Sequence, residues 1–456
     1  MPTPYPYQQA GIDFLARGRA ILGDDVGLGK TGQALLAAQK LDAFPILVVV
    51  PKAATGVWVA EVAKWLEMDA ETYLGPRRKF SRDAPVVITN YALFGEILNK
   101  RAWRLTIWDE AHKFRNGRVG GKGGTRPKLF AAAKKDQAQY AFFLTGTPVV
   151  NDADDLWPLL HLIDPKHWAS YWHYVNAYMF KDNNGFGWKI HGVKDAVGLR
   201  RDIGPYLLRR TKTSPEVSLQ LPPKTRQSWD VQMTRVQKTA YNQLVDEMLA
   251  DLPDGGLLAV PNKIALLTRL RQLLVCPRLI GLDDDGAAFL ALRDLFETAP
   301  HNAVVFTPFA EAVTPLTQLL GDIAQPYWIT GKLSSRKLAE TVAAFEHETW
   351  PKGRSKVLIA TVQMSTSWAA TSAATCYFIG YDWAPAVNEQ AEGRLHRHGQ
   401  VNPVLARYFV HRGTVDEHLM DILSYKTSVA RLATDPAHML RPGTGGRMKQ
   451  RPSVLT

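Results

Sequence analysis

The sequence DDVGLGKTGQ at residues 24–33 decides how the whole chain is interpreted. It follows a short apolar run at residues 20–22 and precedes a helix-like pattern that extends to Lys40. Glycines allow a tight turn in which successive backbone N–H groups point at a phosphate, and the start of the following helix adds the positive end of its dipole. The stretch therefore predicts a phosphate-binding loop between a strand and a helix.

Two side chains of this loop predict nucleotide chemistry. The Lys30 ammonium can reach the β- and γ-phosphates, and the Thr31 hydroxyl can bind Mg²⁺. The usual pattern, G-x-x-x-x-G-K-[ST], begins with a glycine, whereas this chain has Asp24 at that position. From these residues alone, the alternative is an ordinary strand–helix turn with a surface lysine.

Composition indicates a folded protein with an excess of positive charge. The chain has 456 residues, 46% of them apolar and 21% charged, so at least two domains are expected. The net charge of +12 favours a polyanionic partner such as nucleic acid, or an acidic membrane surface, although a solvated basic surface has the same composition. Cys276 and Cys376 have neither metal-ligand nor disulfide spacing, and no secretory signal or membrane-length apolar run is visible. We expect an intracellular protein, cytoplasmic if its source is bacterial or viral, with no membrane partner.

Short apolar runs alternate with amphipathic stretches in two sets, a pattern typical of parallel α/β domains. Each set predicts one buried sheet covered by helices. The first set comprises residues 45–50, 85–89, 104–108 and 141–144, and the second comprises 303–307, 327–330, 356–361, 375–380 and 404–410.

Between the two sets, a proline-containing stretch at residues 213–224 predicts a linker. Helical periodicity at residues 236–252 and 262–275 predicts a bridging helical element. We therefore expect a first lobe at residues 1–222, a linker and helical bridge at 223–295, a second lobe at 296–436 and a basic, disordered tail at 437–456.

Paired carboxylates follow one of the predicted strands, at Asp109 and Glu110. Hydrolysis of a nucleoside triphosphate needs one carboxylate that holds Mg²⁺ and a second group that orients water, and these residues suit the two roles in that order. The alternative is a carboxylate cluster that favours the positive end of a helix dipole.

Two arginines in the second half, Arg394 and Arg397, are three residues apart, which predicts that both project from one helical face. Guanidinium groups offered to a triphosphate would stabilise charge in the transition state. The alternative is a solvated basic helix face.

Together these motifs resemble those of superfamily 2 helicase-type motors, and more narrowly of Swi/Snf-type DNA-dependent ATPases. Residues 24–33 resemble motif I of that family, which explains the aspartate at position 24. Further matches in chain order include residues 109–116 to motif II, 144–148 to motif III, 208–212 with 221–224 to a Swi/Snf signature, and 390–400 to motif VI. Trp188 and residues 199–210 resemble the compact annealing-helicase branch.

The resemblance implies an α/β fold of two tandem RecA-like domains with a helical bridging insertion, and ATP and Mg²⁺ as cofactors. It implies that Lys30, Glu110, Arg394 and Arg397 are catalytic and that Thr31 and Asp109 hold the metal. The implied ATP contacts are Gln8, which would read the adenine, with Gly27, Gly29, Lys30, Thr31 and Gln33. The chain departs from the family at residues 363–368, where the usual glycine-rich turn of motif V is replaced by a sequence ending in Trp368.

A basic, glycine-rich stretch directly after motif II predicts contacts to the nucleic-acid backbone, with an incidental surface loop as the alternative. Its cations are Arg115, Arg118, Lys122, Arg126 and Lys128, and the resemblance adds Lys52, Thr89 and Asn90. Most of the thirteen tryptophans are interpreted as core and packing residues, and they are not interpreted as a platform for stacking bases.

The hypothesis from the sequence is a monomeric, ATP-dependent motor that moves along DNA, in the first place duplex DNA. One alternative is a strand-separating or annealing helicase at forks. The other is a DNA-binding scaffold with weakened motor activity, which only the altered turn at residues 365–368 supports.

Overall fold

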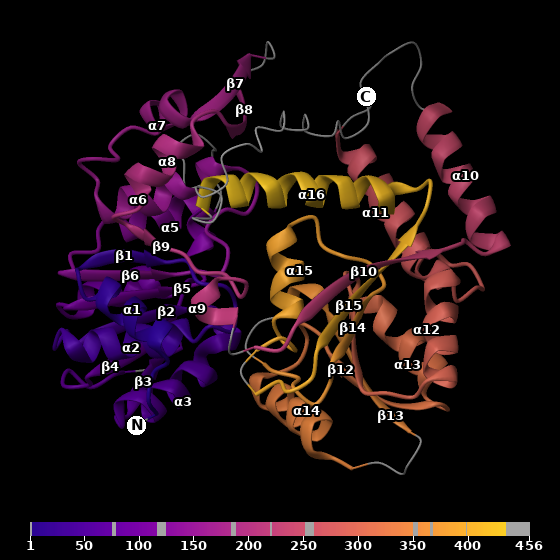
Figure 1. Ribbon diagram of the computed structural model, residues 1–456, viewed down its shortest axis with the longest axis horizontal. Helices are drawn as coiled ribbons and strands as arrows, with labels where there is room; N and C mark the ends of the chain where they lie inside the picture. Colours follow the sequence, from indigo (N-terminus) through magenta and orange to yellow (C-terminus); the bar gives the residue numbers. More distant parts are fainter. Residues whose placement is uncertain are drawn as a thin grey trace. The chain divides into compact units, whose positions relative to one another are not determined.

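The computed structural model describes residues 2–74, 79–115, 125–183, 188–218, 221–250, 260–349, 354–364, 368–397 and 399–434. The chain forms two compact units (Figure 1). Unit 1 contains Met1–Gln220 together with the segment from Tyr425 onward, and unit 2 contains Leu221–Ser424. None of the helices in the described ranges is long and apolar enough to cross a membrane.

Unit 1 is built on a parallel sheet in the order β3-β4-β2-β5-β6-β1-β9. Its strands are β1 (Arg19–Leu22), β2 (Ile46–Val50), β3 (Ala70–Tyr73), β4 (Val86–Asn90), β5 (Leu105–Asp109), β6 (Tyr140–Leu144) and β9 (Leu207–Leu208). The helices of the unit are α1 (Pro6–Leu15), α2 (Lys30–Lys40), α3 (Thr55–Leu66), α4 (Phe94–Ile97), α5 (Thr125–Ala133), α6 (Trp157–Ile163), α7 (Tyr171–Tyr178), α8 (Ala196–Ile203) and α9 (Pro215–Ser218).

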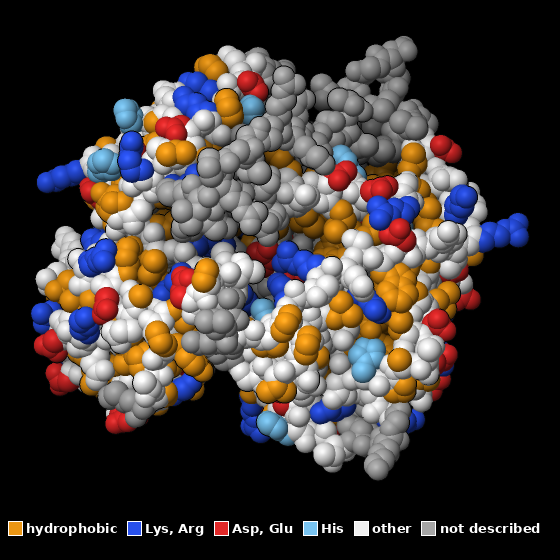
Figure 2. Space-filling model, viewed as in Figure 1, with side chains coloured by type: hydrophobic (Ala, Val, Ile, Leu, Met, Phe, Trp, Pro, Cys, Tyr) orange, Lys and Arg blue, Asp and Glu red, His pale blue; other side chains and the backbone are white. Residues whose placement is uncertain are grey.

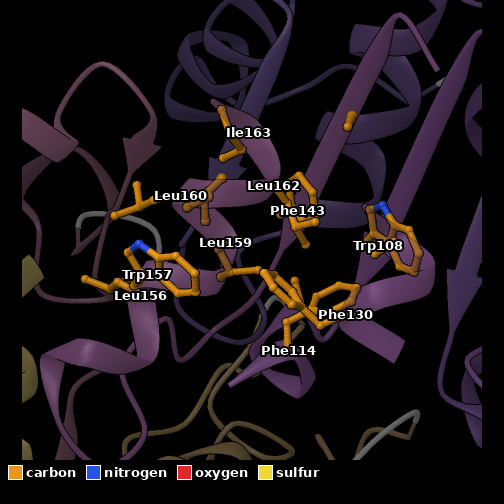
Figure 3. Close-up of a cluster of buried hydrophobic side chains, with 14 of the residues drawn as sticks. Trp108, Phe114, Phe130, Phe143, Leu156, Trp157, Leu159, Leu160, Leu162 and Ile163 are labelled. Carbon is orange, nitrogen blue, oxygen red and sulfur yellow. The ribbon is translucent and has the colours of Figure 1, made fainter. Parts of the chain in front are cut away.

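Both faces of the central strands are buried, and β2 is apolar and buried at every position. Successive side chains of a strand point to opposite faces, so Val48 and Val50 pack under α1, α2 and α3, whereas Leu47 and Val49 face the opposite cluster. That second cluster contains Trp108 of β5 together with Phe130 of α5 and the tryptophan and leucine side chains of α6 (Figure 3). The result is a three-layer unit whose sheet presents the carboxyl ends of its strands at one edge.

A separate antiparallel hairpin extends from the helices of unit 1 (Figure 1). It consists of β7 (Met179–Asn183) and β8 (Trp188–Val193).

Unit 2 contains a second parallel sheet in the order β10-β15-β14-β11-β13-β12. Its strands are β10 (Lys224–Val231), β11 (Ala303–Thr307), β12 (Ala324–Ile329), β13 (Ser355–Thr361), β14 (Thr375–Phe378) and β15 (Val404–His411). The remaining helices are α10 (Arg235–Ala250), α11 (Val260–Val275), α12 (Ala287–Thr298), α13 (Val313–Leu320), α14 (Ser335–His347), α15 (Pro385–Glu392) and α16 (Val415–Thr434). Helices α12 and α13 cover one face of this sheet, and α14 and α15 cover the other.

The predicted fold class, an α/β protein with two parallel sheets flanked by helices, is confirmed. The grouping of the chain differs in detail from the predicted division. Residues 223–295, expected to stand between the lobes, group with unit 2, and the end of α16 from Tyr425 groups with unit 1. The predicted tail at residues 437–456 lies outside the described residues.

Candidate functional site

The glycines of the loop at residues 24–33 have backbone angles that few other residues tolerate. Gly27 has φ 91° and Gly29 has φ 74°, both in the left-handed region. Gly29 also caps α2, whose first residue is Lys30, and a Cβ at Gly29 would lie 2.3 Å from Nε2 of Gln8. The loop therefore has the tight turn and the helix start that the sequence predicts.

Asp24, the residue that replaces the expected first glycine, is fully buried and ion-paired with Arg210. The Arg210 guanidinium donates from Nε to Oδ1 of Asp24 over 2.9 Å and from a terminal nitrogen to Oε1 of Gln33 over 2.8 Å. The amide of Gln33 donates in turn to Oδ2 of Asp24 over 3.2 Å. The aspartate thus joins the loop to a segment almost two hundred residues away in the chain.

The two glutamines predicted to contact ATP support the loop backbone in the structure. Nε2 of Gln8 and Nε2 of Gln33 both donate to the Leu28 carbonyl, over 3.2 and 3.0 Å. Gly11 makes room for this arrangement, because a Cβ there would lie 1.8 Å from Oε1 of Gln33. Both glutamines are buried, and their contacts with a nucleotide remain a prediction.

A second arginine, Arg209, extends the same arrangement. One terminal nitrogen donates to the Gly23 carbonyl over 2.6 Å and to the Gly146 carbonyl over 3.2 Å, and the other donates to Oδ1 of Asp25 over 3.2 Å. Sequence reasoning used Arg209 and Arg210 only as family markers and missed their contacts with the loop. The sequence does contain two adjacent aspartates, at residues 24–25, and two adjacent arginines, at residues 209–210. Their opposite charges are the feature from which these contacts could have been predicted.

The side chain of Lys30, the first residue of α2, extends back over the loop. Its ammonium donates to the carbonyls of Asp24 and Asp25 over 2.6 and 3.1 Å. Burial lowers the pKa of Lys30, while the negative charges of Glu110, Asp24 and Asp109 oppose this effect. These charge interactions bring the predicted lysine and the predicted carboxylates into one site.

Asp109 ends β5, and its carboxylate accepts a hydrogen bond from Nε1 of Trp58 over 2.8 Å. Burial and the neighbouring charge of Glu110 raise the pKa of Asp109 to about 6, while the Trp58 N–H and the charge of Lys30 act in the opposite direction. The carboxyl pair is therefore short of positive charge, a deficit that a bound cation would relieve.

Glu110 has a left-handed backbone, with φ 55°, and one carboxylate oxygen lies 3.2 Å from Nδ1 of His112. The same nitrogen lies 3.2 Å from Oγ1 of Thr145 and 3.3 Å from Oγ1 of Thr147, in the loop after β6. His112 therefore fixes Glu110 relative to the ends of two neighbouring strands.

The residues of this edge fit a nucleotide with Mg²⁺. A hydroxyl from Thr31 and a carboxylate from Asp109 are hard oxygen ligands of the kind that Mg²⁺ prefers. The glycine turn and the start of α2 supply N–H groups for phosphates, and Gly146 leaves space beside Lys30, since a Cβ there would lie 2.7 Å from Val26 and 3.6 Å from the lysine nitrogen.

In unit 2, the expectation that Arg394 and Arg397 share one helical face is wrong, because α15 ends at Glu392. Both arginines lie in the turn that follows the helix, where they converge on one acceptor. The Trp368 carbonyl accepts from Arg394 over 2.9 Å and from Arg397 over 3.3 Å. Arg394 is buried, whereas Arg397 is partly exposed.

Trp368, the bulky residue of the atypical turn, is buried in the core of unit 2. Its ring packs 6.2 Å from that of Phe306, and its Nε1 donates to the Met364 carbonyl over 2.6 Å. These contacts fix the backbone whose carbonyl binds the two arginines. Residues 365–367, also part of the predicted departure, lie outside the described residues.

Glu392 joins the arginine turn to the start of unit 2. The buried carboxylate accepts from Lys224, from Arg226 over 2.7 and 2.8 Å and from the Tyr408 hydroxyl over 2.8 Å. Burial raises the pKa of Glu392, but the charges of Lys224 and Arg226 more than offset this and hold the pKa at about 2. A nitrogen of His396 also lies 2.8 Å from the Pro222 carbonyl, so the predicted signature at residues 221–224 packs on the arginine turn.

The residues predicted to contact nucleic acid have different environments. Lys52 and Lys128 are exposed, and Arg115 is partly buried. Thr89 is fully buried with its hydroxyl bonded to the Tyr73 carbonyl, and Asn90 accepts from the N–H groups of Ala92 and Leu93, so both side chains stabilise unit 1 in this structure. Arg118, Lys122 and the side chain of Arg126 lie outside the described residues.

Two family models match the chain. A SNF2-related domain matches residues 7–278, and a helicase conserved C-terminal domain matches residues 287–399. The first match spans most of unit 1 and the start of unit 2, and the second lies within unit 2.

The chain is similar to longer curated proteins. It is 25% identical to the DNA annealing helicase and endonuclease ZRANB3 of Bos taurus, over 93% of this chain and 40% of that protein. It is 26% identical to the putative ATP-dependent helicase/translocase YwqA of Bacillus subtilis, over 94% of this chain and 48% of that protein. The chain thus spans less than half the length of either relative.

Among solved structures, the chain is similar to the SWI2/SNF2 ATPase core of Sulfolobus solfataricus in complex with dsDNA. The identity is 23%, the match covers 94% of this chain and 92% of that one, and the TM-score is 0.45.

Proposed function

The chain belongs to the SNF2-related family, and we propose that it hydrolyses ATP with Mg²⁺ and uses the reaction to move along DNA. One observation carries the proposal: Lys30, at the start of α2, shares one edge of the unit 1 sheet with Asp109 and Glu110. A phosphate-binding lysine and a carboxylate pair are the groups that triphosphate hydrolysis requires.

In this proposal each residue of the edge has a separate task. Lys30 binds the terminal phosphates, and Thr31 and Asp109 hold Mg²⁺, which neutralises charge on the phosphates when bound. Glu110 orients the attacking water and accepts its proton. His112 keeps the Glu110 carboxylate in position through its contacts with Thr145 and Thr147.

Arg394 and Arg397 of unit 2 are proposed to stabilise the charge of the transition state. Arg397 is the better candidate for direct contact because it is partly exposed. Arg394 is buried, with Nε bonded to the Gln390 carbonyl and a terminal nitrogen bonded to the Trp368 carbonyl, which suits a supporting role.

DNA is proposed as the partner on charge and on similarity. The net charge of +12 favours a polyanion, and the relatives are named as an annealing helicase and a putative helicase/translocase. We further propose that the active species is an intracellular monomer.

The test is ATP turnover by the purified chain with and without duplex DNA. Lys30→Ala should abolish DNA-stimulated hydrolysis, since the terminal phosphates lose their cation. Lys40→Ala is the matched control: it lies on the same helix, is exposed, and pairs with Asp13 on the surface, so turnover should be unchanged. Turnover that is independent of DNA and survives Lys30→Ala would overturn the proposal.

Strand separation or annealing at forks is the second candidate activity, and the projecting β7–β8 hairpin with its exposed aromatic rings favours it. Two assays in parallel distinguish the candidates. Displacement of a triplex-forming strand without opening of a forked duplex supports movement along duplex DNA, whereas opening of the fork supports the second candidate.

A further inference from the structure

The β7–β8 hairpin carries two aromatic rings that are about half exposed. Phe180 is 44% exposed and Trp188 is 50% exposed, and Trp172 in the adjacent α7 is 47% exposed. Interior tryptophans of the same unit, such as Trp58 and Trp108, are 1% exposed. Core packing, which is expected for most of the tryptophans, therefore does not account for Trp172 and Trp188.

The base of the hairpin is firmly anchored in unit 1. Met179 and Val193, which are paired at the start of β7 and the end of β8, are buried in the unit 1 core. The N–H of Gly192 donates to Oδ1 of Asp152 over 3.3 Å, and the N–H of Lys194 donates to the Tyr178 carbonyl over 2.9 Å. The exposed rings therefore extend from a fixed support.

Neighbouring side chains hold each ring in a defined orientation. The ammonium of Lys181 lies 4.6 Å from the centre of the Trp188 ring. The Phe180 ring stacks on His191 at 6.0 Å with an angle of 19° between the planes, and His191 is paired with Asp182 over 2.6 Å. Strand pairing sets Phe180 opposite His191 and Trp188 opposite Asn183, so the two rings lie on opposite faces of the hairpin.

Oriented aromatic rings beside cations are the features that recognise unpaired nucleobases. A base stacks on the ring while a nearby ammonium attracts its phosphate, and neither contact depends on base identity. Residues 179–194 contain three lysines and one aspartate, a balance of +2 with histidine neutral, which complements a polyanion and not an apolar protein surface.

We propose that the β7–β8 hairpin binds single-stranded nucleic acid by stacking unpaired bases on Phe180 and Trp188. The inference rests on the proposed function in taking nucleic acid as the partner, and it adds a site for unpaired bases that is separate from the nucleotide site.

The experiment measures the affinity of the full chain for labelled oligonucleotides by fluorescence anisotropy at one fixed salt concentration. The probes are oligo(dT), oligo(rU) and a blunt duplex. The protein variants are the Phe180→Ala, Trp188→Ala double variant, the conservative Phe180→Tyr, Trp188→Phe double variant, and Trp328→Ala. Trp328 is the matched control because it is 48% exposed but lies in unit 2.

The alanine double variant should lose at least about thirtyfold in affinity for oligo(dT), because it removes the stacking of two bases. Its affinity for the blunt duplex should be nearly unchanged. The conservative variant and Trp328→Ala should bind every probe as the wild type does. The oligo(rU) arm tells whether the site accepts RNA as well as DNA.

Three results would overturn the proposal: unchanged oligo(dT) binding by the alanine variant, an equal loss on oligo(dT) and duplex, or a wild-type dimer that the variant converts to a monomer in sedimentation. The last result would identify the hairpin as a contact between copies of the chain. Failure of the proposed function is recognised separately, since a wild type without DNA-stimulated turnover can still be scored for oligo(dT) binding.

Discussion

At the end of β5, Asp109 carries a carboxyl group whose charge changes within an accessible pH range. Burial and Glu110 raise its pKa to about 6, whereas the Trp58 N–H stabilises the charged form. In the proposed function Asp109 holds Mg²⁺, and only its charged carboxylate can do so. The affinity for ATP in the presence of Mg²⁺ should therefore fall as pH decreases through about 6 and should level off above it.

Two variants should shift, in opposite directions, the pH at which the affinity for ATP falls. Trp58→Phe removes a hydrogen bond to the charged form and so raises the pKa of Asp109, whereas Glu110→Gln removes a repulsive charge and so lowers it. Titration with a fluorescent ATP analogue from pH 5 to 8 checks both, and comparison between variants cancels the titration of the nucleotide itself. A fall in ATP affinity at the same pH in the wild type and in both variants would contradict this assignment.

Trp368 ends the stretch at residues 363–368 that the sequence predicts to differ from motif V of the family, and its buried ring fixes the carbonyl that binds Arg394 and Arg397. Trp368→Ala should lower kcat by at least about tenfold through misplaced arginines, while the affinity for ATP stays the same. Trp368→Phe, which retains the packing but loses the N–H, should be intermediate. A loss of ATP affinity in both variants, with kcat retained, would contradict this role.

The segment that follows β9 contacts the loop at residues 24–33 through Arg209 and Arg210. Arg210→Ala would leave Asp24 buried without its partner and should lower the free energy of unfolding by about 3–5 kcal/mol. Arg201→Ala, which removes an exposed pair with Asp202, is the control and should leave it nearly unchanged. Urea unfolding measures the free energy of unfolding of both variants. Equal losses would show that the buried Arg210–Asp24 pair stabilises the fold no more than the surface pair does.

The buried strands could be predicted from the sequence because both of their faces are apolar. β2, β5 and β11 begin and end within a residue or two of the predicted runs. β10 could not be predicted from the sequence. It is an edge strand with mostly exposed side chains, so its sequence resembles a polar linker.

The candidate site was predictable to the same extent. Lys30, Asp109 and Glu110 belong to local patterns, so the sequence alone predicts their chemistry. The pairs Arg210–Asp24 and Lys224–Glu392 join residues more than 160 positions apart, and no local pattern encodes them. The acceptor shared by Arg394 and Arg397 depends on where α15 ends, which helical spacing alone did not predict.

At the scale of the whole molecule, each unit contributes one set of groups to the proposed reaction. Lys30, which is proposed to bind phosphate, and the two carboxylates belong to unit 1, and the arginines belong to unit 2. If hydrolysis requires both sets, Arg397→Ala should bind ATP normally and fail to hydrolyse it. Arg278→Ala is the control. It removes a surface ion pair with Asp285 in the same unit, and the variant should still bind and hydrolyse ATP.

Displacement of a triplex-forming strand from duplex DNA measures the proposed movement along DNA that ATP hydrolysis drives. The wild type should displace the strand only when ATP and Mg²⁺ are present. Glu110→Gln and Arg397→Ala should bind ATP and DNA without displacing it. Displacement by the wild type without ATP, or by the Glu110→Gln variant at the wild-type rate, would contradict the account.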